Sequence, residues 1–195
     1  MHKANDTFVE QGQKEYFAEV EIAEQMLQEQ KLNNIVRDDK LVCDVYCIPS
    51  HNHQAFFVKL FENEDEYVVL YAKTYIADLL GFHIAMYTFE DCVKAQSHNG
   101  SVGKIICGIK RLPKNNVIIK ELISCLPTKN EWLKSVIIDG EHTVIRNHLQ
   151  EEIKLLSYRS NAQFSENDYS EAQKVFLEKL FLHIEDIIGN VLEYE

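Results

Sequence analysis

The residues best suited to chemistry are two histidines, His51 and His53, that are separated by a single residue. Imidazole nitrogen is a common ligand of zinc, so this pair could begin a metal site. A complete site needs further ligands to converge on it, and Cys47 or His83 would have to supply them. We interpret the segment chiefly as a polar loop and expect no cofactor, with zinc at His51 and His53 as the weaker alternative.

The five cysteines offer thiols that could serve as nucleophiles or metal ligands. Their odd number and unrelated spacings favour reduced thiols over a disulfide framework. Cys43 and Cys47 lie four residues apart on a predicted strand, about 13 Å from each other, which is too far for a disulfide bond. Cys92 or Cys125 paired with a distant histidine would give a nucleophilic enzyme. No local signature of such a pair is present, and we expect no catalytic residue.

The other patterns typical of enzymes are weak. Adjacent carboxylates at 38–39, 64–66 and 151–152 fall in predicted turns, where water solvates them. Acid–base catalysis instead needs carboxylates in a cleft that shifts their pKa values. The segment 100–104 contains two glycines and a lysine but lacks the spacing and the following helix of a phosphate-binding loop. Together these observations favour a protein that is not an enzyme.

The net charge of −11 is concentrated at the two ends of the chain. Residues 1–30 contribute −5 and residues 165–195 contribute −6, whereas the charges of residues 31–164 cancel. Nucleic acids and anionic membranes bind basic surfaces, so neither is expected as a partner. The sequence contains neither a secretory leader nor a stretch long enough to span a membrane, which favours a cytoplasmic location.

Both acidic ends are predicted to form amphipathic helices. Over residues 1–34 the apolar stripe, which Phe8, Phe17 and Met26 widen, consists of Val9, Tyr16, Val20, Ala23 and Leu27. Over residues 167–193 the stripe consists of Phe176, Leu177, Leu180, Phe181, Ile184, Ile187, Ile188, Val191 and Leu192. A stripe this apolar has to pack on a sheet or on another chain.

The segment between the helices, residues 41–160, is predicted to be a sheet-rich core. Residues 41–48 alternate with the two-residue period of a strand, and 55–61 with 67–75 form a predicted hairpin. Asp139-Gly140 between two apolar runs predicts a second hairpin, whereas residues 117–126 are either a buried strand or a short helix. We therefore predict an α+β fold in one domain, residues 1–195. Its mostly antiparallel sheet of about five to eight strands packs with an N-terminal and a C-terminal helix.

Two sets of side chains are candidates for binding a partner protein. Tyr67, Tyr71 and Tyr75 share one face of a predicted strand, as a wall of the core or as a contact surface. The polar sides of the two helices supply the second set, which comprises Glu15, Glu19, Glu24, Glu171, Glu178 and Glu185. We expect these acids to form one face that docks a basic protein.

In its size, its acidity and its lack of catalytic motifs, the chain is similar to bacterial immunity proteins, which block basic toxin nucleases. The order of elements over residues 135–190 also resembles the C-terminal parts of several small bacterial proteins. The resemblance implies a non-enzymatic, inhibitor-like module that binds a basic protein. The alternatives are a self-associating accessory protein that dimerises through residues 175–192, and a metal-dependent or Cys/His enzyme.

Overall fold

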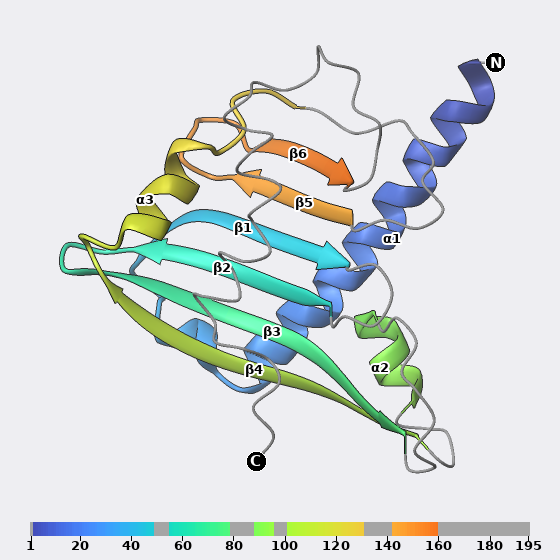
Figure 1. Cartoon of the computed structure of the whole chain (residues 1–195), viewed down its shortest axis with the longest axis horizontal. Helices are drawn as coiled ribbons and strands as arrows, with labels where there is room; N and C mark the ends of the chain where they lie inside the picture. The colour runs from blue at the N-terminus through green and yellow to red at the C-terminus, as the bar shows by residue number, and fades with distance from the viewer. Residues whose placement is uncertain (1, 49–54, 79–87, 96–100, 131–141, 160–195) are drawn as a thin grey trace.

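The computed structural model of the chain describes residues 2–48, 55–78, 88–95, 101–130 and 142–159. The described elements, in chain order, are α1 (His2–Glu29), the 3-10 turn η1 (Leu32–Asn34), β1 (Lys40–Ile48), β2 (Phe56–Glu62), β3 (Glu66–Asp78), α2 (Phe89–Ala95), β4 (Ser101–Pro113), α3 (Val117–Ser124), β5 (His142–Asn147) and β6 (Lys154–Arg159). They form an α+β fold, as the sequence predicted (Figure 1).

The strands form one antiparallel sheet in the order β4-β3-β2-β1-β5-β6. The first four follow one another as a meander, and β5 then pairs with the free side of β1. The predicted hairpin of β2 and β3 is confirmed. Its turn is closed by the Asn63 side chain, whose Oδ1 accepts hydrogen bonds from the backbone N–H groups of Asp65 and Glu66.

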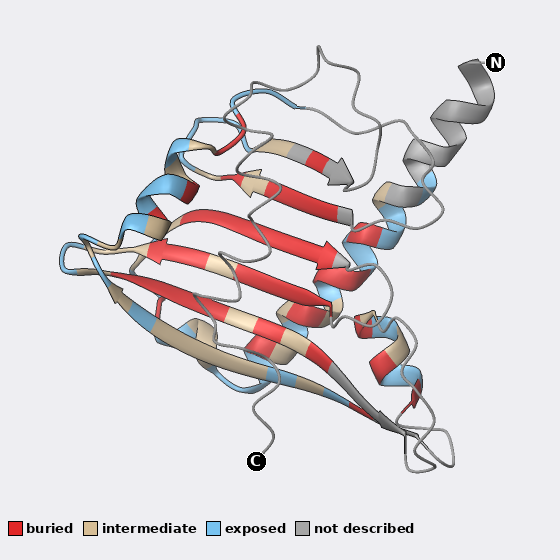
Figure 2. Cartoon of the chain, viewed as in Figure 1, coloured by how far each residue is buried: buried red, intermediate tan, exposed pale blue. Residues whose placement is uncertain are grey.

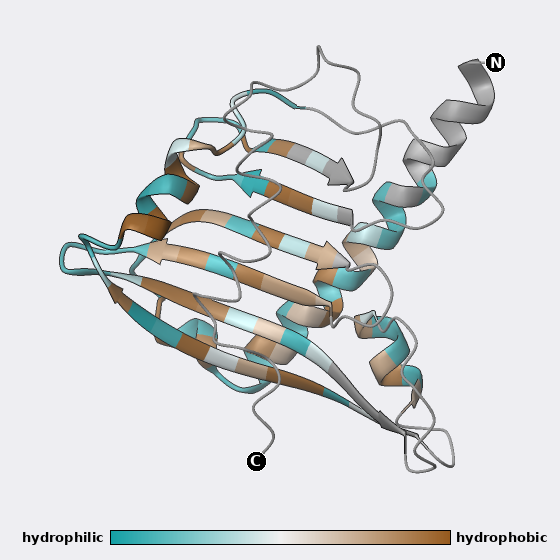
Figure 3. Cartoon of the chain, in the orientation of Figure 1, coloured by the Kyte–Doolittle hydropathy of each residue, from teal (hydrophilic) through white to brown (hydrophobic). Residues whose placement is uncertain are grey.

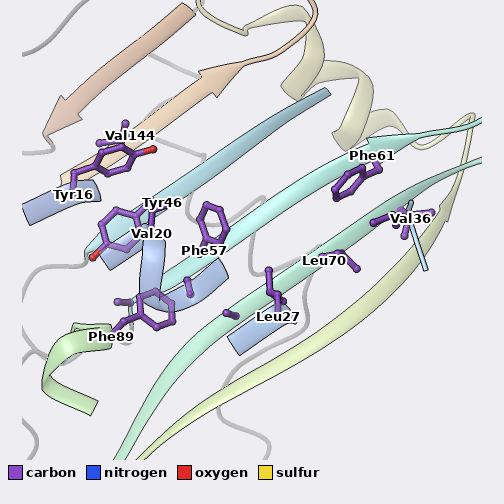
Figure 4. Packing of buried hydrophobic residues seen from close by; sticks show 14 residues of the cluster. Tyr16, Val20, Leu27, Val36, Tyr46, Phe57, Phe61, Leu70, Phe89 and Val144 are labelled. Carbon is purple, nitrogen blue, oxygen red and sulfur yellow. The ribbon is translucent and has the colours of Figure 1, made fainter. Parts of the chain in front are cut away.

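Helix α1 crosses one face of this sheet (Figure 1). Four residues of its predicted stripe, Tyr16, Val20, Ala23 and Leu27, are buried there, whereas Phe17 is half exposed and does not widen the stripe. The remaining large side chains of the cluster on this face include Val36, Tyr46, Phe57, Phe61, Leu70, Phe89 and Val144 (Figure 4). Burial of this aromatic-rich cluster is the main force that holds α1 on the sheet.

The opposite face of the sheet packs with α3 through Ile119 and Leu122. The sequence left residues 117–126 open between a strand and a helix, and the structure gives a helix over most of that range. The Asn116 side chain accepts a hydrogen bond from the Ile119 N–H at 2.9 Å, which caps the first turn. The preceding turn, closed by a hydrogen bond from the Asn116 N–H to the Pro113 carbonyl, ends β4 and allows the helix to begin.

Helix α2 begins with reciprocal hydrogen bonds between Thr88 and Asp91. This is the capping arrangement that a threonine followed three residues later by an acid predicts. The helix then packs so closely on β4 that a Cβ at Gly103 would lie 2.2 Å from the Cys92 carbonyl oxygen. Glycine at this position therefore permits the contact between α2 and the sheet.

Two predicted elements, the Asp139-Gly140 hairpin and the helix over residues 167–193, lie wholly or mostly outside the described residues. The strand after the predicted turn is present as β5, which pairs with β1 and β6. Within the described ranges, no helix combines the length and the apolar character needed to cross a membrane.

Candidate functional site

A hydrogen-bonded cluster of Asp44, Arg146 and His148 joins β1 to β5 and to the residue just after β5. Asp44 of β1 is fully buried, and its two carboxylate oxygens are 2.7 Å from Arg146 Nε and from His148 Nε2. Asp44 and Arg146 are directly opposite in the β1–β5 register. A carboxylate beside an imidazole is the arrangement that orients a general base. Among the described residues, no hydroxyl or thiol hydrogen-bonds the His148 ring. The described part of the cluster therefore holds no nucleophile that the imidazole could activate.

Glu19 of α1 is also buried, because α2 covers it. Its carboxylate accepts hydrogen bonds from the N–H groups of Phe89 and Glu90, at 2.6 and 3.1 Å, and from the Tyr46 hydroxyl at 3.0 Å. Burial raises the pKa of Glu19, and these hydrogen bonds offset part of the rise. Burial, together with the Glu19 charge, also raises the pKa of Tyr46, which keeps the phenol protonated as a donor. Glu19 therefore joins α1, α2 and β1.

Glu24 of α1 binds the sheet through an ion pair. Lys59 Nζ of β2 is 2.8 Å from one carboxylate oxygen of Glu24 and 3.0 Å from the other. The lysine is mostly buried and the glutamate is one-third exposed. Three N-terminal acids were predicted to face a partner. Two of them, Glu19 and Glu24, instead bind other elements of the same chain. For Glu19 the prediction of an exposed contact is wrong, because the side chain has almost no solvent-accessible surface.

The outer side of α1, which we define by Glu15, Phe17, Glu21 and Glu29, is exposed to solvent. Phe17 has 52% of its surface exposed, although its ring makes an edge contact with Tyr16 at 5.0 Å between centroids. Among the described residues, Glu15 accepts a hydrogen bond from the Gln11 side chain, and no described cation pairs with it. This side of the helix combines negative charge with one exposed aromatic ring.

The two described tyrosine side chains of β3, Tyr67 and Tyr71, do not extend the outer side of α1. Tyr67 is buried in the cluster that packs with α3, on the opposite face of the sheet, and Lys114 Nζ lies 4.6 Å from its ring centroid. Tyr71 lies over Gly108, with Lys73 Nζ 5.9 Å from its ring centroid. The side chain of Tyr75 lies outside the described residues. The core interpretation therefore holds for Tyr67, and Tyr71 packs beside the same cluster.

The residues considered for metal binding or catalysis are not gathered into a site by the described structure. His51 and His53, like His83 and the acids Glu171, Glu178 and Glu185, lie outside the described ranges. No group of three metal-ligating side chains is found among the residues that are described. The described cysteines are free thiols, and Cys92 Sγ donates to the Lys104 carbonyl at 3.3 Å. Burial raises the pKa of Cys43, which disfavours its thiolate.

Sequence reasoning missed the cluster of Asp44, Arg146 and His148 because Asp44 is about one hundred residues from the other two. The single local signal was an aspartate inside the apolar strand at 41–48, since a charge there needs a partner from another segment. Which segment supplies that partner depends on β5 pairing with β1, and no sequence period encodes that pairing.

No protein-family model matches the chain, and no curated protein and no solved structure shows a significant match to it. The charges, exposures and contacts of the chain itself therefore support the functional proposal.

Proposed function

We propose that this chain is a non-enzymatic protein-binding module that docks a basic partner protein through the outer side of α1. The observation that carries the proposal is a charge imbalance on exposed side chains. Among the described side chains of α1, Glu15, Glu21 and Glu29 are exposed, and Lys14 is the one basic residue. Glu19 and Glu24 of the same helix already have partners within the protein, so the outer acids are the ones available to another molecule.

The two kinds of side chain on this surface have different roles in docking. The acids steer a basic partner into encounter and keep other acidic proteins away, an effect that weakens as salt increases. Phe17 supplies an apolar anchor, because an exposed aromatic ring gains most when a partner pocket covers it. The predicted acids Glu171, Glu178 and Glu185 would add to the same field if their helix lies beside α1.

The chemical class of the partner follows from this charge. A protein with a basic cleft or patch, such as the nucleases that bacterial immunity proteins block, matches a surface that is negative and contains one aromatic ring. Binding would occlude the basic region and so inhibit any activity that depends on it. Tyr67 is excluded from this docking surface by its burial on the other face of the sheet.

The test compares three versions of the protein as capture reagents in a lysate of the native host. The first is the unchanged chain, the second carries Glu15→Lys, Glu21→Lys and Glu29→Lys, and a third serves as a charge-matched control. The control reverses three exposed acids outside α1, namely Glu64, Asp65 and Glu151. Each protein retained by the unchanged chain is then purified and its Kd measured by calorimetry at two salt concentrations.

The proposal predicts a basic protein that the unchanged chain and the control both bind and that the α1 variant loses. Its Kd should weaken by at least about tenfold as salt rises from 50 to 200 mM, as expected when several charge pairs contribute. Phe17→Ser should weaken binding further without changing the salt dependence. A partner that binds all three versions equally, or whose Kd is insensitive to salt, would contradict the proposal.

A further inference from the structure

A second surface with the opposite charge lies at the edge of the sheet. Strand β4 is one of the two edge strands of the described sheet and pairs with β3 over its whole length without a break in register. No described strand pairs with its other side (Figure 1). Figure 2 shows that the described part of β4 is largely intermediate or exposed, whereas β1, β2 and β3 are largely buried. An open edge presents backbone groups that another strand can pair with.

The direction of these backbone groups follows from one hydrogen bond in the neighbouring strand. The Thr74 N–H donates to the Ala55 carbonyl at 2.9 Å, so Thr74 directs its backbone groups towards β2. Residues alternate in direction along an antiparallel ladder, and Thr74 is opposite Ile105. The N–H and C=O of Ile105, and likewise those of Cys107 and Ile109, therefore point away from β3 to the open edge.

The open part of this edge has a definite extent. Just before this part, Gly103 and Lys104 contact Cys92 of α2, which packs on a face of the sheet there. Pro113 ends the strand and has no N–H to donate. The stretch 105–111 therefore lies between these limits and offers outward backbone groups at every second residue. This length suits an added strand of about five to seven residues.

The side chains of β4 select the kind of strand that fits. The strand carries three basic residues, Lys104, Lys110 and Arg111, and no acid, and Arg111 forms an ion pair with Glu66 of β3. Figure 3 shows that hydrophilic and hydrophobic residues both lie along the strand. Two copies of β4 side by side would place these charges against each other, which disfavours self-pairing. On one face Lys104 and Lys110 flank Ile106, which is 40% exposed, and on the other face Ile105, Cys107 and Ile109 are partly buried and apolar. A matching strand alternates acidic with apolar side chains.

We propose that the edge of β4, residues 105–111, binds an extended acidic segment of a partner protein by strand addition. The backbone hydrogen bonds to Ile105, Cys107 and Ile109 supply affinity, and the basic side chains supply selectivity. This surface is separate in residues and opposite in charge from the outer side of α1. It would stand even if the docking of a basic protein by α1 were disproved.

The test uses the whole chain and a seven-residue capped peptide that alternates glutamate and valine. Amide hydrogen exchange, followed residue by residue by NMR, should be fast at Ile105, Cys107 and Ile109 in the free protein and slow at Ile106 and Gly108. Adding the peptide should slow exchange at the first three by at least about tenfold. A peptide that alternates lysine and valine should not do so, nor should the glutamate peptide with N-methylated valines, which cannot complete the ladder.

Paired variants test the role of charge at the same edge. Lys104→Glu with Lys110→Glu should weaken binding of the glutamate peptide by about tenfold or more. The matched control, Lys14→Glu with Lys120→Glu, should leave the Kd unchanged. Slow exchange at Ile105, Cys107 and Ile109 in the free protein would mean that the edge is already covered and would overturn the proposal. Equal binding of the two alternating peptides, or dimerisation of the free chain through β4, would also overturn it.

Discussion

The two sides of α1 use the same residue type in opposite ways. On the inner side, Glu19 is buried and accepts three hydrogen bonds, and Glu24 forms an ion pair with β2. On the outer side, Glu15, Glu21 and Glu29 are exposed to solvent. The inner acids join the helix to the sheet and to α2, whereas the outer acids give the helix a negative surface. A charge count over the whole helix combines these two roles and overstates the charge available for binding.

The comparison also shows what separates two neighbours on the helix. Glu15 and Glu19 are four residues apart, so they are neighbours on the helix surface, at the border between its outer and inner sides. Only Glu19 is buried, because the first residues of α2 lie against it and donate their backbone N–H groups. The position of α2, rather than the period of α1, therefore decides which acid is structural.

The largest effect is expected at the cluster of Asp44, Arg146 and His148. Asp44→Ala leaves Arg146 buried without its carboxylate partner, which should lower the free energy of unfolding by about 3–5 kcal/mol. Urea unfolding followed by circular dichroism measures this change. Asp38→Ala, at an exposed position, is the control and should change stability by less than about 0.5 kcal/mol. A loss below about 1 kcal/mol for Asp44→Ala would show that the cluster contributes little to stability.

The next largest effect separates Glu19 from Glu15. Glu19→Ala leaves the N–H groups of Phe89 and Glu90 and the Tyr46 hydroxyl without their acceptor, which should cost about 1–3 kcal/mol. Glu15→Ala removes only an exposed contact with Gln11 and should cost less than about 0.5 kcal/mol. Equal losses for the two substitutions, measured by urea unfolding, would remove the distinction between the sides.

The pH dependence of stability sharpens the same distinction. Burial raises the pKa of Glu19 above its usual value of 4.5, so the folded protein retains a proton that the unfolded chain has already released. The free energy of unfolding should therefore fall as pH rises from 4.5 through the folded-state pKa of Glu19. The stabilisation that this bound proton provides is fully present only below that pH range. Glu19→Gln keeps a neutral side chain and should remove this fall.

The measurement is urea unfolding of both proteins at several pH values between 4 and 8. The stability of Glu19→Gln relative to the unchanged protein should improve with increasing pH, since the other carboxylates are common to both. A difference that is independent of pH, or that changes in the opposite direction, would mean that Glu19 titrates normally.

A smaller effect is expected at the ion pair between Glu24 and Lys59. A double-mutant cycle with Glu24→Gln and Lys59→Met should give a coupling energy of about 0.5–1 kcal/mol, because the pair is only partly screened by solvent. The same cycle on Glu90 and Lys94, an exposed pair in α2, should give less. A coupling energy near zero for Glu24 and Lys59 would place Glu24 among the outer acids.

The sequence predicted most of the elements because their signals are local. The strands β1, β2 and β3 and four residues of the inner stripe of α1 are confirmed. The short helix α3 was left open, since eight apolar-rich residues suit either a strand or a helix until the cap at Asn116 is seen. Phe17 was assigned to the core stripe although it is exposed.

The candidate site was less predictable because it depends on contacts between distant segments. The carboxylate of Glu19 meets α2 across some seventy residues, and Asp44 meets β5 across about one hundred. Neither contact has a local signature in the sequence, so Glu19 and Glu24 were predicted to be exposed with the other acids. The charge of the edge strand β4 was missed for a related reason, since only the strand order shows that its basic residues border an open side.

The most direct test of the account measures the surface potential of α1 in solution. Paramagnetic relaxation of backbone amides is recorded by NMR with a cationic and with an anionic nitroxide cosolute at low ionic strength, where surface charges are least screened. The cationic probe should relax the amides of Glu15, Glu21 and Glu29 more strongly than the anionic probe, and Glu15→Lys, Glu21→Lys and Glu29→Lys together should reverse that order. Equal relaxation by the two probes along α1 would contradict the claim that its outer acids remain available to a basic partner.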